Sequence, residues 1–313
     1  MADSKTCTPA FKPLLTTTDW NGEWIELQKT RRHADNAEFW NERAKTFPKA
    51  NHPSGYVDDF LLYAGIPAGS TVLDMGCGTG ALSIPLAQKG CHVIAADFSQ
   101  GMLDVLKQSC REPVAGSIET KLMSWDDDWS SKGLGSNSVD FALASRSIAT
   151  DNLGNALGKL TEVASRKACI TLSTGSSPRA DERILTELGL QNLVGRDFLY
   201  AFMILADKGF LPEVHYIRSR REETFQSPQE ARETLERMVE HSARHLVGDE
   251  RLDKALEQLD QWVKENLVEN PDQGQPDDHG GAQKAFKLKE PRIATWGFIS
   301  WNCNPGYSYA LEK

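Results

Sequence analysis

The chain has 313 residues, 40% of them hydrophobic, and its 44 acidic against 35 basic residues give a formal net charge of −9. This composition is that of an ordinary soluble globular protein with one large or two average domains. A duplex binder needs a basic face to neutralise phosphates, so the acidic balance argues against nucleic acid as a partner. The densest basic cluster, Arg218, Arg220 and Arg221, runs directly into Glu222 and Glu223, and we interpret it as a solvated strand end.

No stretch reaches the roughly 18 consecutive apolar residues that a membrane helix needs. The first residues, MADSKTCTPAFKPL, lack the charged and then apolar layout of a signal peptide. We therefore expect a cytoplasmic protein that contacts no membrane. The six cysteines are scattered without ligand spacing, which predicts neither a disulfide scaffold nor a metal site.

Two amphipathic helices rich in indole are predicted near the N-terminus. Asp19 can cap the first, which carries Trp20 and Trp24 on one face. The second, FWNERAKTF, stops before Pro48. We predict that residues 1–50 form a tail and a helical lid.

From residue 71 onward, short apolar strands alternate with amphipathic helices. The pattern predicts strands at 71–73, 91–96, 121–124, 139–144 and 168–172, with helices at 81–89, 99–110 and 155–164. This alternation is typical of a mostly parallel sheet with both faces covered. Later elements are a helix ending at Gly209, a strand at 214–217, polar helices at 228–246 and 250–267, a loop at 270–281 and a final strand at 294–301.

The most informative segment is VLDMGCGTG, where a strand ends in glycines and passes into a helix. Such glycines let a ligand approach the backbone, because they have no Cβ and tolerate positive φ. Gly76, Gly78 and Ala81 formally match the dinucleotide fingerprint, and Asp97 lies near the usual ribose-binding distance downstream. Asp74, however, would repel a pyrophosphate and attract a cationic ligand. An NAD-dependent oxidoreductase stays open as an alternative.

VLDMGCGTG followed by VIAADFSQGML resembles the first two signature segments of the class I S-adenosylmethionine-dependent methyltransferases, and the likeness extends over about residues 39–172. Within that family the chain is most similar to small-molecule methylases related to the ubiquinone and menaquinone biosynthesis enzymes. The resemblance implies an enzyme that methylates a small-molecule acceptor with S-adenosylmethionine and releases S-adenosylhomocysteine. A non-catalytic S-adenosylmethionine-binding regulatory protein is a second alternative.

The fold class predicted from pattern and resemblance is α/β. We expect a Rossmann-like, doubly wound, mostly parallel seven-stranded sheet with an N-terminal helical lid and a helical insertion before the last strand. The predicted boundaries are 51–225 for the cofactor-binding core, 226–290 for the insertion and 291–313 for the final strand.

The resemblance also assigns a cofactor site, which comprises Asp74, Gly76, Cys77, Gly78, Gly80, Asp97, Phe98, Ser99, Met102, Ser124, Trp125, Asp126 and Ser145. The glycines would line the methionine part of the cofactor, and Asp74 would orient its amino group. Asp97 would accept from both ribose hydroxyls. Trp125 would cover the adenine ring and Asp126 would accept from its amino group, although the Gly-Asp pair usual in the family is absent here. Cys77 at the helix start is interpreted as packing rather than as a nucleophile.

Methyl transfer is an in-line displacement, which enzymes accelerate by holding donor and acceptor in near-attack geometry without a dedicated residue. We therefore assign no catalytic residue and keep Arg146 and His33 as candidates. Arg146 would bind an anionic acceptor or a carboxylate, or would instead pair with a structural acid. His33 would be a general base or simply a surface histidine.

Trp40, Arg43 and Phe47 resemble the W-x-x-x-A-x-x-[YF] helix that closes over the cofactor in many small-molecule methyltransferases, with core packing as the alternative. In the late insertion, His241 and His245 are four residues apart, a spacing that can chelate a metal. Without a third ligand we interpret them as part of a solvated face. The insertion is also a candidate homodimer contact.

Overall fold

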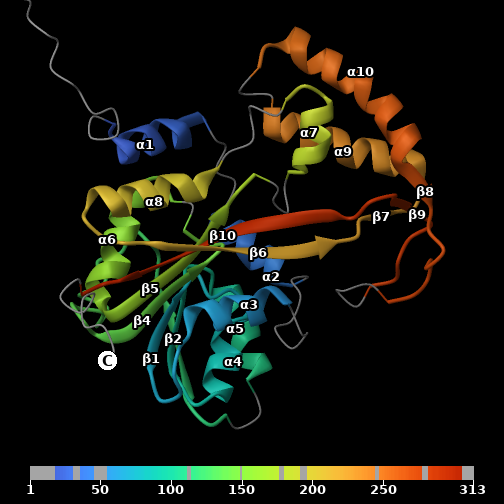
Figure 1. The fold of residues 1–313 in the computed structure, drawn as a ribbon. Helices are drawn as coiled ribbons and strands as arrows, with labels where there is room; N and C mark the ends of the chain where they lie inside the picture. Colours follow the sequence, from blue (N-terminus) through green and yellow to red (C-terminus); the bar gives the residue numbers. More distant parts are fainter. Residues whose placement is uncertain are drawn as a thin grey trace, which may run out of the picture.

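The computed structural model describes residues 18–30, 36–45, 55–110, 114–148, 150–175, 180–190, 196–243, 247–276 and 281–304. A seven-stranded sheet of order β3-β2-β1-β4-β5-β10-β6 forms its centre (Figure 1). Its strands are β1 (Thr71–Met75), β2 (His92–Asp97), β3 (Ser117–Leu122), β4 (Val139–Ser145), β5 (Ala164–Ser173), β6 (Glu213–Arg221) and β10 (Arg292–Asn302). The first five pair in parallel, whereas β10 runs antiparallel between β5 and β6. The predicted Rossmann-like, mostly parallel sheet of seven strands is confirmed.

Helices cover both faces of this sheet. One face packs against α3 (Gly55–Ala64), α4 (Ser83–Gln88) and α5 (Gln100–Ser109), and the other against α1 (Trp20–Thr30), α6 (Leu153–Val163) and α8 (Asp197–Asp207). Successive side chains of a strand point to opposite faces, so Phe141 packs with the first group and Ala142 with the second. Burial on both faces explains why the central strands β1 and β4 are nearly continuous apolar runs, whereas the edge strands β3 and β6 are largely polar.

The two predicted lid helices lie in different places. Asp19 caps α1 as expected, since its Oδ1 accepts from the Gly22 N–H at 2.8 Å. Trp24 anchors α1 over α6 and α8, where its fully buried indole donates to the Thr150 carbonyl at 2.7 Å. The second helix, α2 (Ala37–Ala44), contacts α5 instead. Only α2 therefore lies against a helix that carries residues of the assigned cofactor site.

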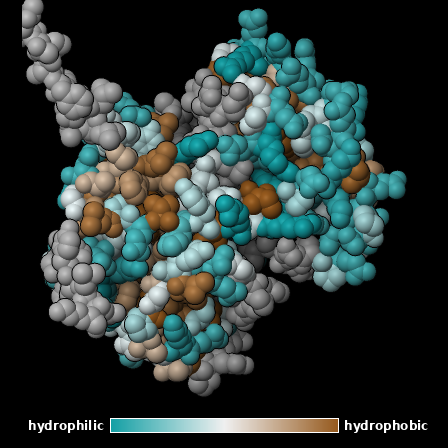
Figure 2. Space-filling view, viewed as in Figure 1, coloured by the Kyte–Doolittle hydropathy of each residue, from teal (hydrophilic) through white to brown (hydrophobic). Residues whose placement is uncertain are grey.

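The late insertion contains more than two helices. The polar helices α9 (Pro228–Ala243) and α10 (Asp249–Asn266) form as predicted, and they share a hydrophobic cluster with α7 (Glu182–Glu187). A small sheet of order β7-β9-β8 completes this lobe, built from β7 (Thr224–Phe225), β8 (Leu267–Glu269) and β9 (Phe286–Leu288). Strands of two or three residues give no readable period, so the sequence did not predict them. Figure 2 shows a mostly hydrophilic surface over α9 and α10.

Of the helices in the described ranges, none is long and apolar enough to cross a bilayer. The five described cysteines are Cys77, Cys91, Cys110, Cys169 and Cys303, and all are free thiols.

We expect Trp24→Ala to lower the free energy of unfolding by about 3–5 kcal/mol, because the substitution empties a fully buried indole site and leaves the Thr150 carbonyl without its donor. Urea denaturation measures this change. Leu62→Ala is the control, since Leu62 is 72% exposed and its loss should cost less than about 0.5 kcal/mol. A cost below about 1 kcal/mol for Trp24→Ala would contradict the assignment of α1 to the core.

Candidate functional site

The glycine turn after β1 has the conformation that its sequence predicts. Gly76, Gly78 and Gly80 have φ values of 74°, 54° and 93°, a region that side chains disfavour. A Cβ on Gly76 would lie 2.3 Å from the Cβ of Ser147, so this glycine allows close packing. At Gly78 a Cβ would meet nothing within 4 Å. The missing side chain of Gly78 therefore leaves open space beside the turn.

Asp97, at the end of β2, fixes one side of this space. Its Oδ2 accepts from the Gly78 N–H at 2.9 Å, and its Oδ1 accepts from the Ser99 N–H at 2.8 Å. The Phe98 backbone N–H also donates to this carboxylate, and carboxylate oxygens are acceptors that can take a further hydrogen bond from a ligand's hydroxyl. Asp97 is buried, and this burial raises the pKa of its carboxyl.

Asp74, in β1, is a second buried carboxylate beside the turn. Its Oδ2 accepts from the Ser83 hydroxyl at 2.6 Å, and the Ser83 backbone N–H also donates to it. Burial raises the pKa of Asp74 to about 6, a rise opposed by the Ser83 hydrogen bonds and increased by the charge of Asp97. The two carboxylates make this end of the sheet strongly attractive to a cation.

The cofactor that the resemblance implies fits these residues. An amino group and a sulfonium are both positive, as a site with two buried carboxylates requires. The hydroxyls of a ribose are hydrogen-bond donors of the kind that the Asp97 carboxylate accepts. The open space over Gly78 lies beside the Asp97 carboxylate, to which the Gly78 N–H donates, and a side chain at this position would fill it.

The N-terminus of α5 carries the next assigned residues. Ser99 caps the helix by accepting from the Met102 N–H at 3.2 Å, and both residues are buried, whereas Phe98 is half-buried. Asn41 of α2 docks here, because its Oδ1 accepts from the Ser99 hydroxyl at 2.8 Å and from the Gly101 N–H at 2.9 Å. Sequence reasoning missed Asn41, although it lies inside the FWNERAKTF segment that was singled out.

The aromatic residues of that segment are only partly described. The half-buried Trp40 makes an edge contact with Phe39 at a centroid distance of 5.5 Å, and Arg43 is exposed. Phe47 lies outside the described residues, as does His33. Closure of Trp40, Arg43 and Phe47 over the cofactor stays a prediction.

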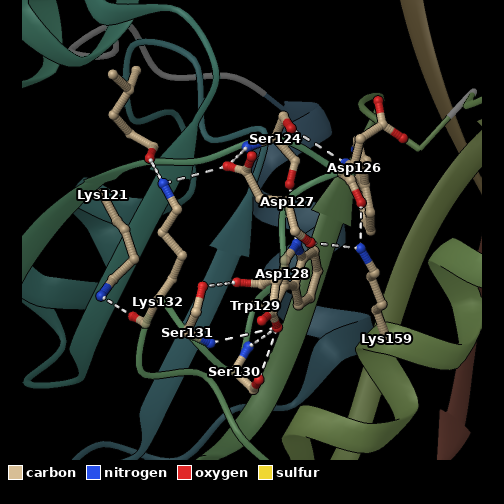
Figure 3. Close-up of polar contacts among 12 residues, drawn as sticks. Lys121, Ser124, Asp126, Asp127, Asp128, Trp129, Ser130, Ser131, Lys132 and Lys159 are labelled. Carbon is tan, nitrogen blue, oxygen red and sulfur yellow. Dashed lines mark hydrogen bonds and ion pairs between the residues drawn. The ribbon is translucent and has the colours of Figure 1, made fainter.

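The loop after β3 is fixed by lysines (Figure 3). Lys159 of α6 donates to the carbonyls of Trp125 at 2.6 Å and Asp127 at 2.9 Å. The Trp125 indole donates to the Ser147 carbonyl at 2.8 Å, which ties this loop to the residue that packs on Gly76. Trp125 thus lies next to the glycine turn.

Within the same loop, Asp127 makes the contacts that organise the backbone. It accepts from the Ser124 N–H at 3.0 Å and lies 3.5 Å from the Lys132 amine, and these contacts lower the pKa of its carboxyl. Asp126 is exposed, and its N–H donates to the Ser124 hydroxyl at 3.2 Å. The Asp126 carboxylate thus has no part in holding the loop, and its contact with an adenine stays a prediction.

Tyr56 of α3 organises the ends of β4 and β5. Its hydroxyl lies 2.7 Å from both the Ser145 Oγ and the Thr171 Oγ1. The assigned Ser145 is therefore already engaged with Tyr56. Sequence reasoning missed α3, although apolar residues at Tyr56, Phe60 and Ala64 recur at the four-residue spacing of a helix face.

Arg146 follows directly on β4. Its backbone has a φ of 57°, and its N–H donates to the Thr171 hydroxyl at 3.0 Å. The guanidinium carbon lies 4.2 Å from the centroid of the Tyr56 ring. Within the described ranges, no carboxylate oxygen lies within ion-pair distance of Arg146, so the structure gives no support to the structural-acid alternative.

The remaining cysteine and histidine candidates are Cys77, His241 and His245. Cys77 is buried in the core, and burial together with the charges of Asp74 and Asp97 raises its thiol pKa well above the ordinary value, which disfavours a nucleophilic thiolate. His241 is exposed, and His245 lies outside the described residues. Over the part of the chain that the structure describes, no three metal-ligating side chains cluster.

Asp74→Asn should stabilise the cofactor-free protein at pH 8 by about 3 kcal/mol. The folded-state pKa near 6 exceeds the ordinary 3.8, so wild-type stability falls as pH rises from about 4 to 6, and the neutral amide removes this penalty. Urea denaturation of both proteins at pH 8 and pH 4.5 measures the difference, which should shrink at the lower pH. A destabilised variant at pH 8 would show that the Asp74 charge is fully compensated.

A known protein family matches the segment that builds this site, and several known proteins are similar to parts of the chain. A family described as "Methyltransferase domain" matches residues 72–166. An uncharacterized protein of Haemophilus influenzae is 30% identical over 182 residues, covering 58% of this chain and 66% of that protein. A demethylmenaquinone methyltransferase of Clavibacter sepedonicus is 58% identical over 38 residues, covering 12% and 16%. The solved structure of a magnesium protoporphyrin IX methyltransferase from Synechocystis, with bound SAH, has a TM-score of 0.39 at 19% identity, covering 64% and 89%.

The chain spans 66% of the length of the first of these curated relatives and 16% of the second. The family match runs from β1 to the start of β5 and includes Asp74, the glycine turn and Asp97. It thus falls on the same residues that form the two-carboxylate site. Residues 72–166 of the chain thus form a methyltransferase domain.

Proposed function

We propose that the chain transfers a methyl group from S-adenosylmethionine to a small-molecule acceptor. The observation that carries the proposal is the pair of buried carboxylates, Asp74 and Asp97, next to the open space over Gly78. Asp74 would hold the amino group of the cofactor and Asp97 its ribose hydroxyls. When bound, the cofactor supplies an electrophilic methyl group on a sulfonium.

The contacts of Asp74 favour this cofactor over NAD. A pyrophosphate binds helix N-termini through free backbone N–H groups. Here the first residue of α4, Ser83, directs both its hydroxyl and its backbone N–H to Asp74. The helix start is therefore already occupied by a negative charge, which repels a second anion.

The residues at the ends of β4 and β5 would orient the acceptor rather than deprotonate it. Burial raises the pKa of Tyr56 above its ordinary value of 10, so its hydroxyl stays protonated near neutral pH. The hydroxyls of Ser145 and Thr171 complete a hydrogen-bonded group that fixes Tyr56. Catalysis by proximity and orientation is consistent with these groups. The acidic net charge of −9 further favours a small acceptor over a nucleic acid.

The test is methyl transfer from S-adenosylmethionine labelled on its methyl group, with a protein-free metabolite extract as the source of acceptors. We expect label in a small molecule with wild type and none with Gly78→Leu, because leucine fills the space over the turn. Gly69→Leu is the matched control: Gly69 also has a positive φ, of 80°, and open space around its Cβ, but lies before β1. Both substitutions should cost about 1–2 kcal/mol of stability.

Three outcomes separate the alternatives. Label transferred by wild type and Gly69→Leu, but not by Gly78→Leu, supports the proposal. Binding of S-adenosylmethionine without transfer of the labelled methyl group to any molecule of the extract would favour a regulatory protein that binds the cofactor without catalysis. Equal transfer by Gly78→Leu would contradict the assigned cofactor position.

A further inference from the structure

Arg146 is held in an unusual backbone conformation above two aromatic rings. Its left-handed φ of 57° costs a residue with a side chain about 1–2 kcal/mol, and such strain concentrates at functional sites. The guanidinium carbon lies 4.2 Å from the Tyr56 ring centroid and 5.9 Å from that of Trp296. Stacking on the faces of rings leaves the N–H groups at the guanidinium edge available to a ligand.

Arg221 projects from β6 on the same side of the sheet. Ile217 is opposite Trp296 of β10, and both pack with Tyr56. Side chains two residues apart share a face of a strand, so Arg221 faces the side of Tyr56 and Arg146. Trp296 is also opposite Ser173, the last residue of β5. Ile217 of β6 is therefore level with the end of β5. The next four residues of β6 extend about 13 Å beyond that end.

The acidic residues after Arg221 are engaged elsewhere. Glu222 pairs with Arg220 at 2.5 Å, and Glu223 pairs with Arg292. Arg221 is half-buried, so the interpretation of this cluster as a solvated strand end is wrong for Arg221. Among the side chains that the structure describes, no carboxylate lies within ion-pair distance of its guanidinium.

The charges of the two arginines act on each other. Burial lowers the pKa of Arg221, and the positive charge of Arg146 lowers it further. Nearby Arg292, whose pKa burial lowers to about 10, has Glu223 as its partner, whereas neither Arg146 nor Arg221 has a described one. The guanidinium groups of Arg146 and Arg221 repel each other and neither has a described carboxylate partner. An anion bound to both would reduce this repulsion.

We propose that Arg146 and Arg221 together bind an anionic group of the methyl acceptor, a carboxylate or a phosphate. This inference rests on the proposed function and names the class of its substrate. The position suits an acceptor, because Ser147, adjacent to Arg146, packs on Gly76 of the cofactor turn and donates to the Met75 carbonyl at 2.6 Å. An anion held by Arg146 would thus place the rest of its molecule near the methyl donor.

The test measures small anions binding to the full chain saturated with S-adenosylhomocysteine, by calorimetry. Phenyl phosphate and benzoate are the two anionic probes, and benzyl alcohol is the neutral control. We expect at least one anion to bind at least tenfold more tightly than benzyl alcohol, and the stronger of the two identifies phosphate or carboxylate. Arg146→Gln and Arg221→Gln should each weaken that probe at least tenfold, while S-adenosylhomocysteine affinity changes less than threefold.

Arg218→Gln is the matched control, since Arg218 belongs to the same strand, is exposed and carries the same charge. It should change probe affinity less than twofold. If a glutamine variant does not fold, Arg221→Lys keeps the charge, loses the planar fork and should weaken the probe by an intermediate factor.

Equal binding of the neutral probe, or unchanged anion affinity in either glutamine variant, would overturn this inference while leaving the proposed function intact. Failure of the folded wild type to bind S-adenosylhomocysteine would overturn the proposed function and the inference together.

Discussion

Two buried carboxylates at the ends of neighbouring strands are the constraint to which the rest of the site conforms. β1 and β2 pair in parallel with Met75 opposite Ala96, which brings Asp74 and Asp97 to one edge of the sheet. Burial alone would favour their neutral forms. Ser83 donates to Asp74, and the Gly78 and Ser99 N–H groups donate to Asp97. These hydrogen bonds stabilise the negative charges of Asp74 and Asp97, and a cationic ligand would stabilise them further.

The glycine turn and the helix starts follow from that constraint. Gly78 can direct its N–H to Asp97 because it adopts a positive φ, and its missing side chain leaves the adjacent space open. Ser99 both donates to Asp97 through its backbone and caps α5. Asn41 then bonds to the same cap and brings α2 to the site. Each contact positions the next element around the carboxylates.

The acceptor side of the sheet has the opposite local charge. The antiparallel strand β10 separates β5 from β6, so β6 extends its final residues beyond the end of β5. Arg221 at that end and Arg146 after β4 are cations within an acidic chain. The arrangement places negative charge beside the proposed donor and positive charge beside the proposed acceptor, which would keep the two ligands in separate places.

Local patterns in the sequence predicted the central strands and the position of the glycine turn, because buried parallel strands are apolar runs and the turn needs glycine. The edge strand β3 was predicted at 121–124 but lies at Ser117–Leu122, since its half-exposed sequence SIETKL contains no apolar run. Local patterns did not predict contacts between distant segments. Tyr56 and Asn41 belong to helices that precede β1. The sequence around Tyr56 does not indicate Ser145 as its partner, and the sequence around Asn41 does not indicate Ser99. Arg221 looked solvated because Glu222 and Glu223 follow it, yet those acids pair with other arginines in three dimensions.

Calorimetric titration of the purified chain with S-adenosylmethionine at pH 8, with NAD as the comparison, tests the central claim most directly. The two-carboxylate site predicts that S-adenosylmethionine binds at least 100-fold more tightly than NAD, a difference of about 2.7 kcal/mol. Tighter binding of NAD, or no binding of S-adenosylmethionine by a folded sample, would contradict the account.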